Sequence, residues 1–104
     1  MKYINSIIEK ISKNPGLYIG KKSLERLSTF LSGYECALNM VLQDFPYFDS
    51  KFQQFIENKY GLTYCTKHWS EIISANTTEE EAFDLFLQYW NEMNEERTEY
   101  VSET

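Results

Sequence analysis

The segment Lys13–Leu27, with the sequence KNPGLYIGKKSLERL, combines residue types that can bind an anion. Lys21 and Lys22 supply two cations, and Ser23 follows them at the predicted start of a helix. Backbone N–H groups at a helix N-terminus, helped by neighbouring ammonium groups, can hold a phosphate or a carboxylate. The same residues also suit a surface turn that only reverses the chain, and we favour this plainer interpretation.

The remaining polar side chains do not have the spacing of a catalytic or metal site. His68 is the single histidine and no nucleophile motif accompanies it, so we expect neither a catalytic triad nor a zinc site. Glu80 and Asp84 lie four residues apart, on one face of a predicted helix, but no second carboxylate pair faces them. We interpret that face as solvated or partner-binding, and we predict no enzyme, no metal and no cofactor.

Length and composition indicate one small domain. The chain has 104 residues, a usual size for a single domain. Its eight Tyr, seven Phe and two Trp suit a small core, because large rings bury much area per residue. No apolar run approaches the ~20 residues of a membrane helix, and no signal peptide pattern opens the sequence. We therefore expect no membrane association, a cytoplasmic protein and two reduced cysteines, Cys36 and Cys65.

Charge is distributed unevenly along a chain whose net charge is −6. Residues 1–26 carry six basic and two acidic side chains, whereas residues 79–104 carry nine acidic side chains and one arginine. The acidic end disfavours a nucleic acid partner, because phosphate binding needs cations. It favours a basic protein partner, whose approach it would steer. The candidate partner-binding residues are Glu80, Glu81, Asp84 and Glu92.

The apolar pattern predicts a mainly α, single compact domain of four to five helices, with one short β element left open. Four isoleucines at helical spacing predict an amphipathic helix over residues 3–12. Pro15 and Gly16 are expected at the centre of a type II turn, with positive φ at Gly16. Residues 17–19 are expected to be extended.

The second helix is predicted over residues 24–42, with Ser23 as its N-cap. Leucines at helical spacing form its buried face, and residues 44–46, Asp-Phe-Pro, are expected to end it. Gly33 lies in mid-helix, which costs ~1 kcal/mol relative to alanine. We expect another helix to approach closely at this glycine.

Three shorter elements are expected next. A third helix begins near residue 50 and ends with Gly61 as its C′ residue. Residues 62–65 could form a short strand, and residues 68–75 form a short helix with a buried apolar face.

A capping box formed by Thr78 and Glu81 opens the last helix, which we expect to end near Glu96. Glutamates in its first turn complement the helix dipole. The predicted division is a helical domain over residues 1–97 and a flexible acidic tail over residues 98–104.

The letters NPGLYIG resemble the RPGMYIG segment of gyrase-type ATPase domains. In that family the following helix carries a water-activating Glu and, four residues later, a magnesium-binding Asn. Aligning ECAL, residues 35–38, with the end of that helix places Ser28 and Ser32 at these two positions. Serine replaces neither group, and the glycine-rich ATP-lid segments are absent. A degenerate nucleotide-binding module is therefore the least favoured alternative.

A second resemblance covers residues 4–86. The chain begins with a short amphipathic helix. The motifs that follow are, in order, [RN]-P-G-[LM]-Y-[IL]-G-x-x-S-L-x-x-L, F-L-x-G-Y, F-x-x-F-I, W-S-x-I-I and E-E-E-A-F. This order is similar to small bacterial proteins encoded near polymorphic or contact-dependent toxins, which look like their immunity proteins. The matching residues are Pro15, Gly16, Tyr18, Gly20, Ser23, Leu24, Leu27, Phe30, Gly33, Tyr34, Phe52, Phe55, Trp69, Ile72, Glu81, Ala82 and Phe86.

This resemblance implies an immunity protein that neutralises a cognate toxin by binding it, without any catalytic residue of its own. Such toxins are commonly nucleases with basic clefts, and an acidic inhibitor would complement that charge. An adaptor or regulatory protein that binds something other than a toxin is the alternative. Neither the sequence nor the resemblance indicates the oligomeric state.

The two serines lead to a first prediction. Because Ser28 and Ser32 stand where a base and a metal ligand are needed, isothermal titration of the chain with magnesium and ATP should give no binding heat. Saturable binding in the micromolar range would contradict this assignment.

Overall fold

The computed structural model describes residues 2–42 and 48–102, with side chains described as far as Glu95. These residues form six helices and no strand. The helices are α1 (Lys2–Lys13), α2 (Pro15–Ile19), α3 (Leu24–Leu42), α4 (Phe48–Lys59), α5 (Trp69–Ser74) and α6 (Glu79–Ser102). The prediction of a mainly α single domain is confirmed, and residues 62–65 lie in a loop and do not form the strand left open above.

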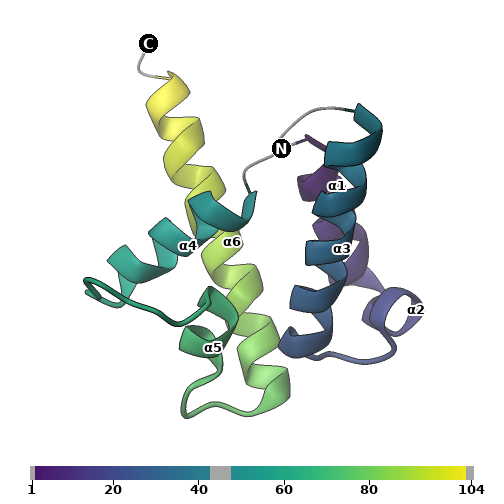
Figure 1. Cartoon of the computed structure of the whole chain (residues 1–104), viewed down its shortest axis with the longest axis horizontal. Helices are drawn as coiled ribbons and strands as arrows, with labels where there is room; N and C mark the ends of the chain where they lie inside the picture. Colours follow the sequence, from purple (N-terminus) through teal and green to yellow (C-terminus); the bar gives the residue numbers. More distant parts are fainter. Residues whose placement is uncertain (1, 43–47, 103–104) are drawn as a thin grey trace.

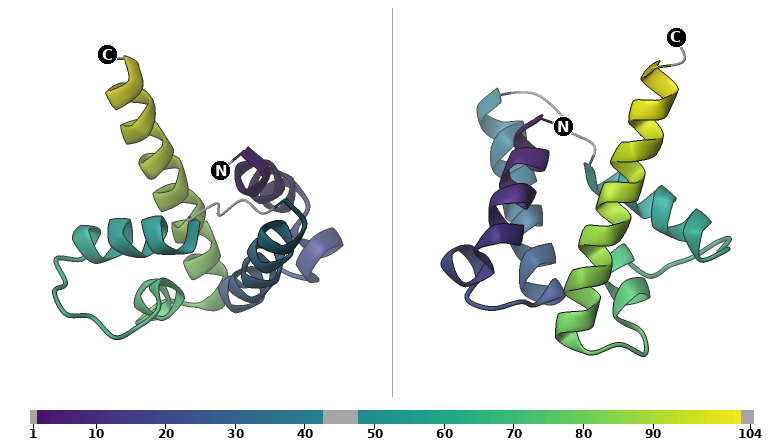
Figure 2. Two further views of the ribbon diagram at one scale, coloured as in Figure 1. Left: turned by 45° about the horizontal axis from the view of Figure 1, so that its top comes forward. Right: turned by 180° about the vertical axis from the view of Figure 1, so that it is seen from behind.

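Helix α6 runs between two groups of helices (Figure 1). One group contains α1, α2 and α3, and the other contains α4 and α5, as both views of Figure 2 also show. Contacts of α6 with α3, α4 and α5 join the two groups. The last helix therefore organises the domain.

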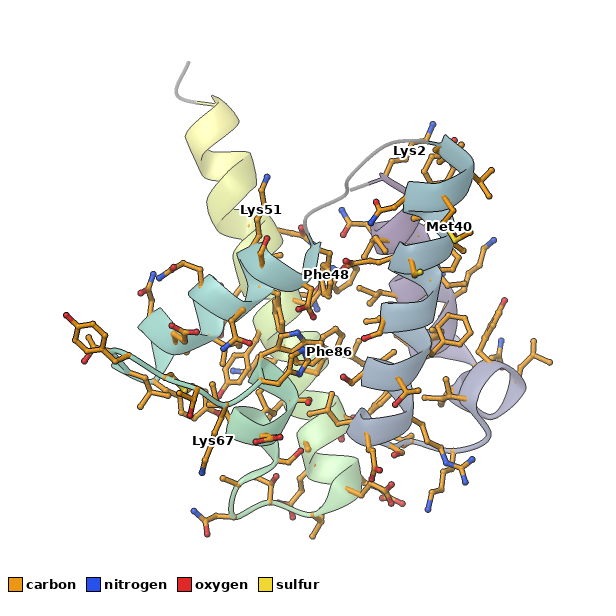
Figure 3. All side chains as sticks on the ribbon, viewed as in Figure 1. Lys2, Met40, Phe48, Lys51, Lys67 and Phe86 are labelled. Carbon is orange, nitrogen blue, oxygen red and sulfur yellow. The ribbon has the colours of Figure 1, made fainter. Side chains whose placement is uncertain are left out.

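The core has an aliphatic part and an aromatic part. In the first group, isoleucines of α1 pack with leucines of α3, and the buried side chains are Ile4, Ile8, Ile11, Leu24, Leu27 and Leu31. In the second group, Phe52 lies 5.0 Å from Trp69 and 5.1 Å from Phe86, between ring centroids. Phe48 and Phe86 point toward one another (Figure 3). Each aromatic pair contributes roughly 0.5–1.5 kcal/mol beyond the burial of its area.

The predicted helix caps are confirmed. The Arg26 amide donates to Ser23 Oγ at 3.2 Å, at the start of α3. At the start of α6, the Glu81 amide donates to Thr78 Oγ1 at 3.1 Å, and the Thr78 amide donates to the Glu81 carboxylate at 3.5 Å. Gly61 has a φ of +66°, and its amide donates to a carbonyl of the last turn of α4, as expected of a C′ glycine.

The turn predicted at Pro15 and Gly16 is wrong. Pro15 begins the short helix α2, where its fixed φ is favourable and its missing N–H group is not needed. Residues 17–19 are therefore helical and not extended. The positive φ occurs at Gly20, with +88°, and not at Gly16. The chain reverses after this short helix rather than before it.

Two further expectations about helices are wrong. Gly33 is exposed, and a Cβ added to it would meet no atom within 4 Å, so no described helix approaches it. Helix α6 continues to Ser102 and does not end near Glu96, because its sequence there contains no glycine or proline. The predicted stop at residues 44–46 lies outside the described residues.

The position of the positive φ leads to a second prediction. Gly20→Ala should lower the free energy of unfolding by roughly 1–3 kcal/mol, because alanine resists this φ. Its Cβ would also lie 2.5 Å from Arg26 Nη1, which now donates to the Ile19 carbonyl at 3.0 Å. Gly16→Ala is the control: it adds a methyl group in open space and should leave stability unchanged or raised. Urea denaturation of both variants tests this, and parent-like stability of Gly20→Ala would contradict it.

Candidate functional site

The loop between α2 and α3 lies against the first turns of α6. Lys21 Nζ is 3.2 Å from a Glu79 carboxylate oxygen, and Lys22 Nζ is 2.8 Å from Asp84 Oδ1. The hydroxyl of Ser23, a fully buried residue, also hydrogen-bonds to Glu79. The sequence motif and the acidic helix start are therefore neighbours, although more than fifty residues separate them.

A hollow of about 650 Å³ opens at this contact. Its lining contains two cations, two carboxylates and two half-buried aromatic rings, and the full set is Tyr18, Ile19, Lys21, Ser23, Glu25, Arg26, Thr29, Phe30 and Glu79. We call the hollow and the adjoining exposed residues Glu80 and Glu81 the junction surface.

Lys21 and Lys22 of the motif already have carboxylate partners. The hydrogen bond from Ser23 and the ammonium of Lys21 lower the pKa of Glu79. The hydrogen bond to Asp84 raises the pKa of Lys22. These contacts oppose the anion-binding interpretation of the motif, because both lysines face carboxylates of α6.

The four candidate partner-binding residues do not form one group. Glu80, Glu81 and Asp84 lie in the first two turns of α6, beside the motif loop. Glu92 lies two turns further along, where its carboxylate is 2.6 Å from Lys59 Nζ on α4. Asp84 and Glu92 are therefore engaged within the chain, whereas Glu80 forms no ion pair with any described residue.

The six residues singled out in the sequence motif also lie in different places. Tyr18, Gly20 and Ser23 lie at or beside the hollow, where Gly20 ends α2 and Ser23 caps α3. Pro15 and Gly16 form the first turn of α2, away from the lining of the hollow. The sixth, Gly33, lies on the exposed side of α3.

Sequence reasoning did not find a polar network between α4 and α5. Asp49 Oδ1 accepts from His68 Nε2 and from Trp69 Nε1, both at 2.9 Å. His68 Nδ1 accepts from the amide of Ser70 at 3.3 Å and is 2.8 Å from its hydroxyl. This assignment of the histidine protons follows from the surrounding hydrogen bonds.

Asp49, His68 and Ser70 thus follow one another in the order of a catalytic triad. However, His68 Nδ1 already accepts the backbone amide of Ser70, which makes His68 the N-cap of α5. The network therefore caps α5 and joins it to the first turn of α4. No local sequence signal marks Asp49 as its partner, because the two residues lie nineteen positions apart.

Glu35 links α3 to the start of α4. One of its carboxylate oxygens accepts the Asp49 amide at 3.0 Å, so a side chain of one helix caps another. Burial of Glu35, and then the nearby Asp49 carboxylate, raise the pKa of Glu35. The hydrogen bond from the Asp49 amide acts in the opposite direction and is the weaker effect.

Two kinds of feature are absent from the residues that the structure describes. Among residues 2–42 and 48–102, no helix combines the length and apolarity needed to cross a bilayer. Over the same ranges, no three His, Cys, Asp or Glu side chains gather as a group able to hold a metal ion.

No family model, curated protein or solved structure matches this chain. The resemblance to immunity proteins therefore stays a prediction.

The raised pKa of Glu35 leads to a third prediction. The folded state holds this proton to a higher pH than the unfolded state, so the carboxyl destabilises the fold as pH rises above its ordinary pKa of 4.5. Glu35→Gln keeps an oxygen acceptor and removes this effect. The variant should gain stability relative to the parent between pH 4 and pH 7, with Glu71→Gln on the exposed side of α5 as the control. A pH-independent difference between Glu35→Gln and the parent in urea melts would refute this effect.

Proposed function

We propose that this chain is an immunity protein that neutralises a cognate bacterial toxin by direct binding, with the junction surface as its binding site. The observation that carries the proposal is the contact of the motif loop with the acidic start of α6. That contact joins the motif on which the resemblance rests to the acidic residues that complement a basic partner.

The charge of the junction surface supports a basic partner. Glu25 and Glu80 are exposed and form no ion pair with any described residue. The junction surface contains four carboxylates, Glu25, Glu79, Glu80 and Glu81, against two cations, Lys21 and Arg26, so its net charge is −2. On a chain of net charge −6, such a surface attracts cations and steers their approach.

The hollow supports recognition of a basic side chain. The rings of Tyr18 and Phe30 line it together with the carboxylate of Glu25, which forms no ion pair with any described residue. An aromatic face and a carboxylate together suit an ammonium or a guanidinium, through cation–π attraction and a charge-assisted hydrogen bond. A lysine or arginine of the toxin would thus enter the hollow, while Glu80 and Glu81 contact its surroundings.

The ion pairs of α6 make Glu80 a better residue than Asp84 for testing this proposal. Reversing Asp84 would place a cation against Lys22, which lies 2.8 Å away, and would disturb the surface itself. Glu80 has no such ion pair and is exposed. Glu95 is an exposed glutamate on the same helix, about 22 Å from Glu80 at 1.5 Å per residue. It provides a matched control for the same change of charge.

Our fourth prediction compares these two reversals. Glu80→Lys should slow association with the toxin encoded beside the gene at least tenfold at about 0.1 M salt, because steering acts mainly on the association rate. Glu95→Lys should change that rate by less than about twofold, because screening limits its reach to about 10 Å. Surface plasmon resonance measures both rates, and survival of cells that express the toxin measures protection.

Two outcomes would contradict the proposal. Equal association rates for the two variants would place the binding surface elsewhere on the chain. Failure of the parent chain to protect cells from the neighbouring toxin would favour an adaptor with another partner. Thermal melts of both variants should stay close to the parent, because exposed charges contribute roughly 0–1 kcal/mol to stability.

A further inference from the structure

A second hollow adjoins the junction surface, between α3 and α5. It has a volume of about 380 Å³. Its lining consists of six polar residues, Glu25, Ser28, Thr29, Ser70, Glu71 and Ser74. Helix α5 and the first turns of α3 lie at the end of the domain where α6 begins (Figure 1). Because Glu25 and Thr29 line both hollows, the two are neighbours along the first turns of α3. We call the second one the α3–α5 hollow.

The polar groups on the side chains that line the α3–α5 hollow are two carboxylates and four hydroxyls. Lys21 and Arg26 line the first hollow, whereas no lining residue of the second carries a positive charge. Glu25 and Glu71 are exposed, and neither forms an ion pair with any described residue. The α3–α5 hollow therefore has a charge of −2 that no group in its lining offsets.

The hydroxyl of Ser70 adds a hydrogen-bond acceptor to this hollow. Its oxygen is 2.8 Å from His68 Nδ1, and that nitrogen has no proton because it accepts from the Ser70 amide. The ring proton is on His68 Nε2, which donates to Asp49. The Ser70 hydroxyl therefore donates its proton to the histidine, and the lone pairs of its oxygen remain for a ligand. The hydrogen bonds that cap α5 thus turn an acceptor toward the hollow.

A positively charged hydrogen-bond donor matches this lining. The ammonium group of lysine and the guanidinium group of arginine have several N–H donors and no acceptor. Their hydrogen bonds to carboxylates are stronger than those between neutral groups. An anionic ligand would instead meet two carboxylates and no cation in the lining, and such a contact between like charges is unfavourable. The α3–α5 hollow therefore suits the same class of side chain as the hollow of the junction surface.

We propose that the α3–α5 hollow binds a second basic side chain of the partner, next to the one that enters the hollow of the junction surface. This inference rests on the function proposed above. Because the two hollows share lining residues, their basic side chains come from residues close together in the partner. An extended segment offers such a pair, since its side chains i and i+2 lie on one side about 7 Å apart. The partner thus presents a segment with two neighbouring basic residues.

Glu71 is the residue of this hollow that a variant can test separately. Glu25 lines both hollows, so its substitution would affect both. Glu71 lines only the second of the two and is exposed on α5. Glu71→Gln keeps an oxygen acceptor, removes one negative charge and should leave the fold unchanged, because exposed charges contribute little to stability. For the same reason, its loss should lower the affinity for a basic side chain only roughly threefold.

Titration of the full chain with short peptides, followed by amide chemical shifts in NMR spectra, tests the proposal without the toxin. The probe acetyl-Arg-Ala-Arg-amide should bind roughly threefold more tightly than acetyl-Arg-Ala-Ala-amide, because it fills both hollows. It should shift the amide signals of residues 70–74 together with those of residues 18–30. Glu71→Gln should weaken binding of the two-arginine probe roughly threefold. Glu95→Gln removes the same charge further along α6, outside both linings, and should leave this affinity unchanged.

Three results of this titration would overturn the inference. Equal affinities of the two probes would mean that the second arginine finds no site on the chain. Shifts confined to residues 18–30 would leave the α3–α5 hollow empty. Equal losses of affinity in Glu71→Gln and Glu95→Gln would show an effect of net charge alone.

Binding to the toxin separates this inference from the proposed function. Glu71→Gln should raise the dissociation rate roughly threefold, because loss of a contact acts mainly on dissociation. If Glu80→Lys slows association while Glu71→Gln leaves dissociation unchanged, the proposed function stands and the second basic site is overturned. If the parent chain binds no toxin, the proposed function fails, and the peptide titration still decides whether the α3–α5 hollow binds a second basic side chain.

Discussion

The packing of Phe86 against Phe52 and Trp69 is the interaction on which the rest of the structure depends. All three side chains are at most 1% exposed, and they come from three different helices. Truncation of a buried phenylalanine costs roughly 3–5 kcal/mol, a large part of the 5–15 kcal/mol that stabilises a typical domain. These rings fix the position of α6 against α4 and α5.

The position of α6 in turn creates the junction surface. Its first turn meets Ser23, which is buried, and its acidic side chains meet Lys21 and Lys22. Exposed ion pairs of this kind contribute at most about 1 kcal/mol each. The aromatic core therefore places the helix, and the lysines only orient the carboxylates that surround the hollow. The function proposed for this surface depends on a core contact that itself binds nothing.

Local signals predicted much of the fold, and long-range contacts could not be predicted. The helix caps at Ser23 and Thr78 and the C′ glycine Gly61 depend only on residues within one turn of the helix. The sequence alone was therefore enough to predict them. The turn at Gly16 was wrong because proline followed by glycine suits a helix start as well as a type II turn. For the candidate site, the sequence indicated the motif and the acidic helix separately. Their contact depends on how α6 packs, which no local pattern encodes.

The pairing of charges across the chain also revises the view of its acidic end. Net charge along the sequence made all of α6 a candidate surface, but Asp84 and Glu92 pair with lysines of other segments. Near the motif, Glu25 and Glu80 form no ion pair with any residue that the structure describes.

Hydrogen–deuterium exchange of the chain, alone and bound to the toxin that we propose as its partner, tests the central claim most directly. The account predicts that binding protects residues 18–26 and residues 79–84 together, because they form one surface. Protection of only one of these segments, or protection confined to the loop over residues 60–68, would contradict the account.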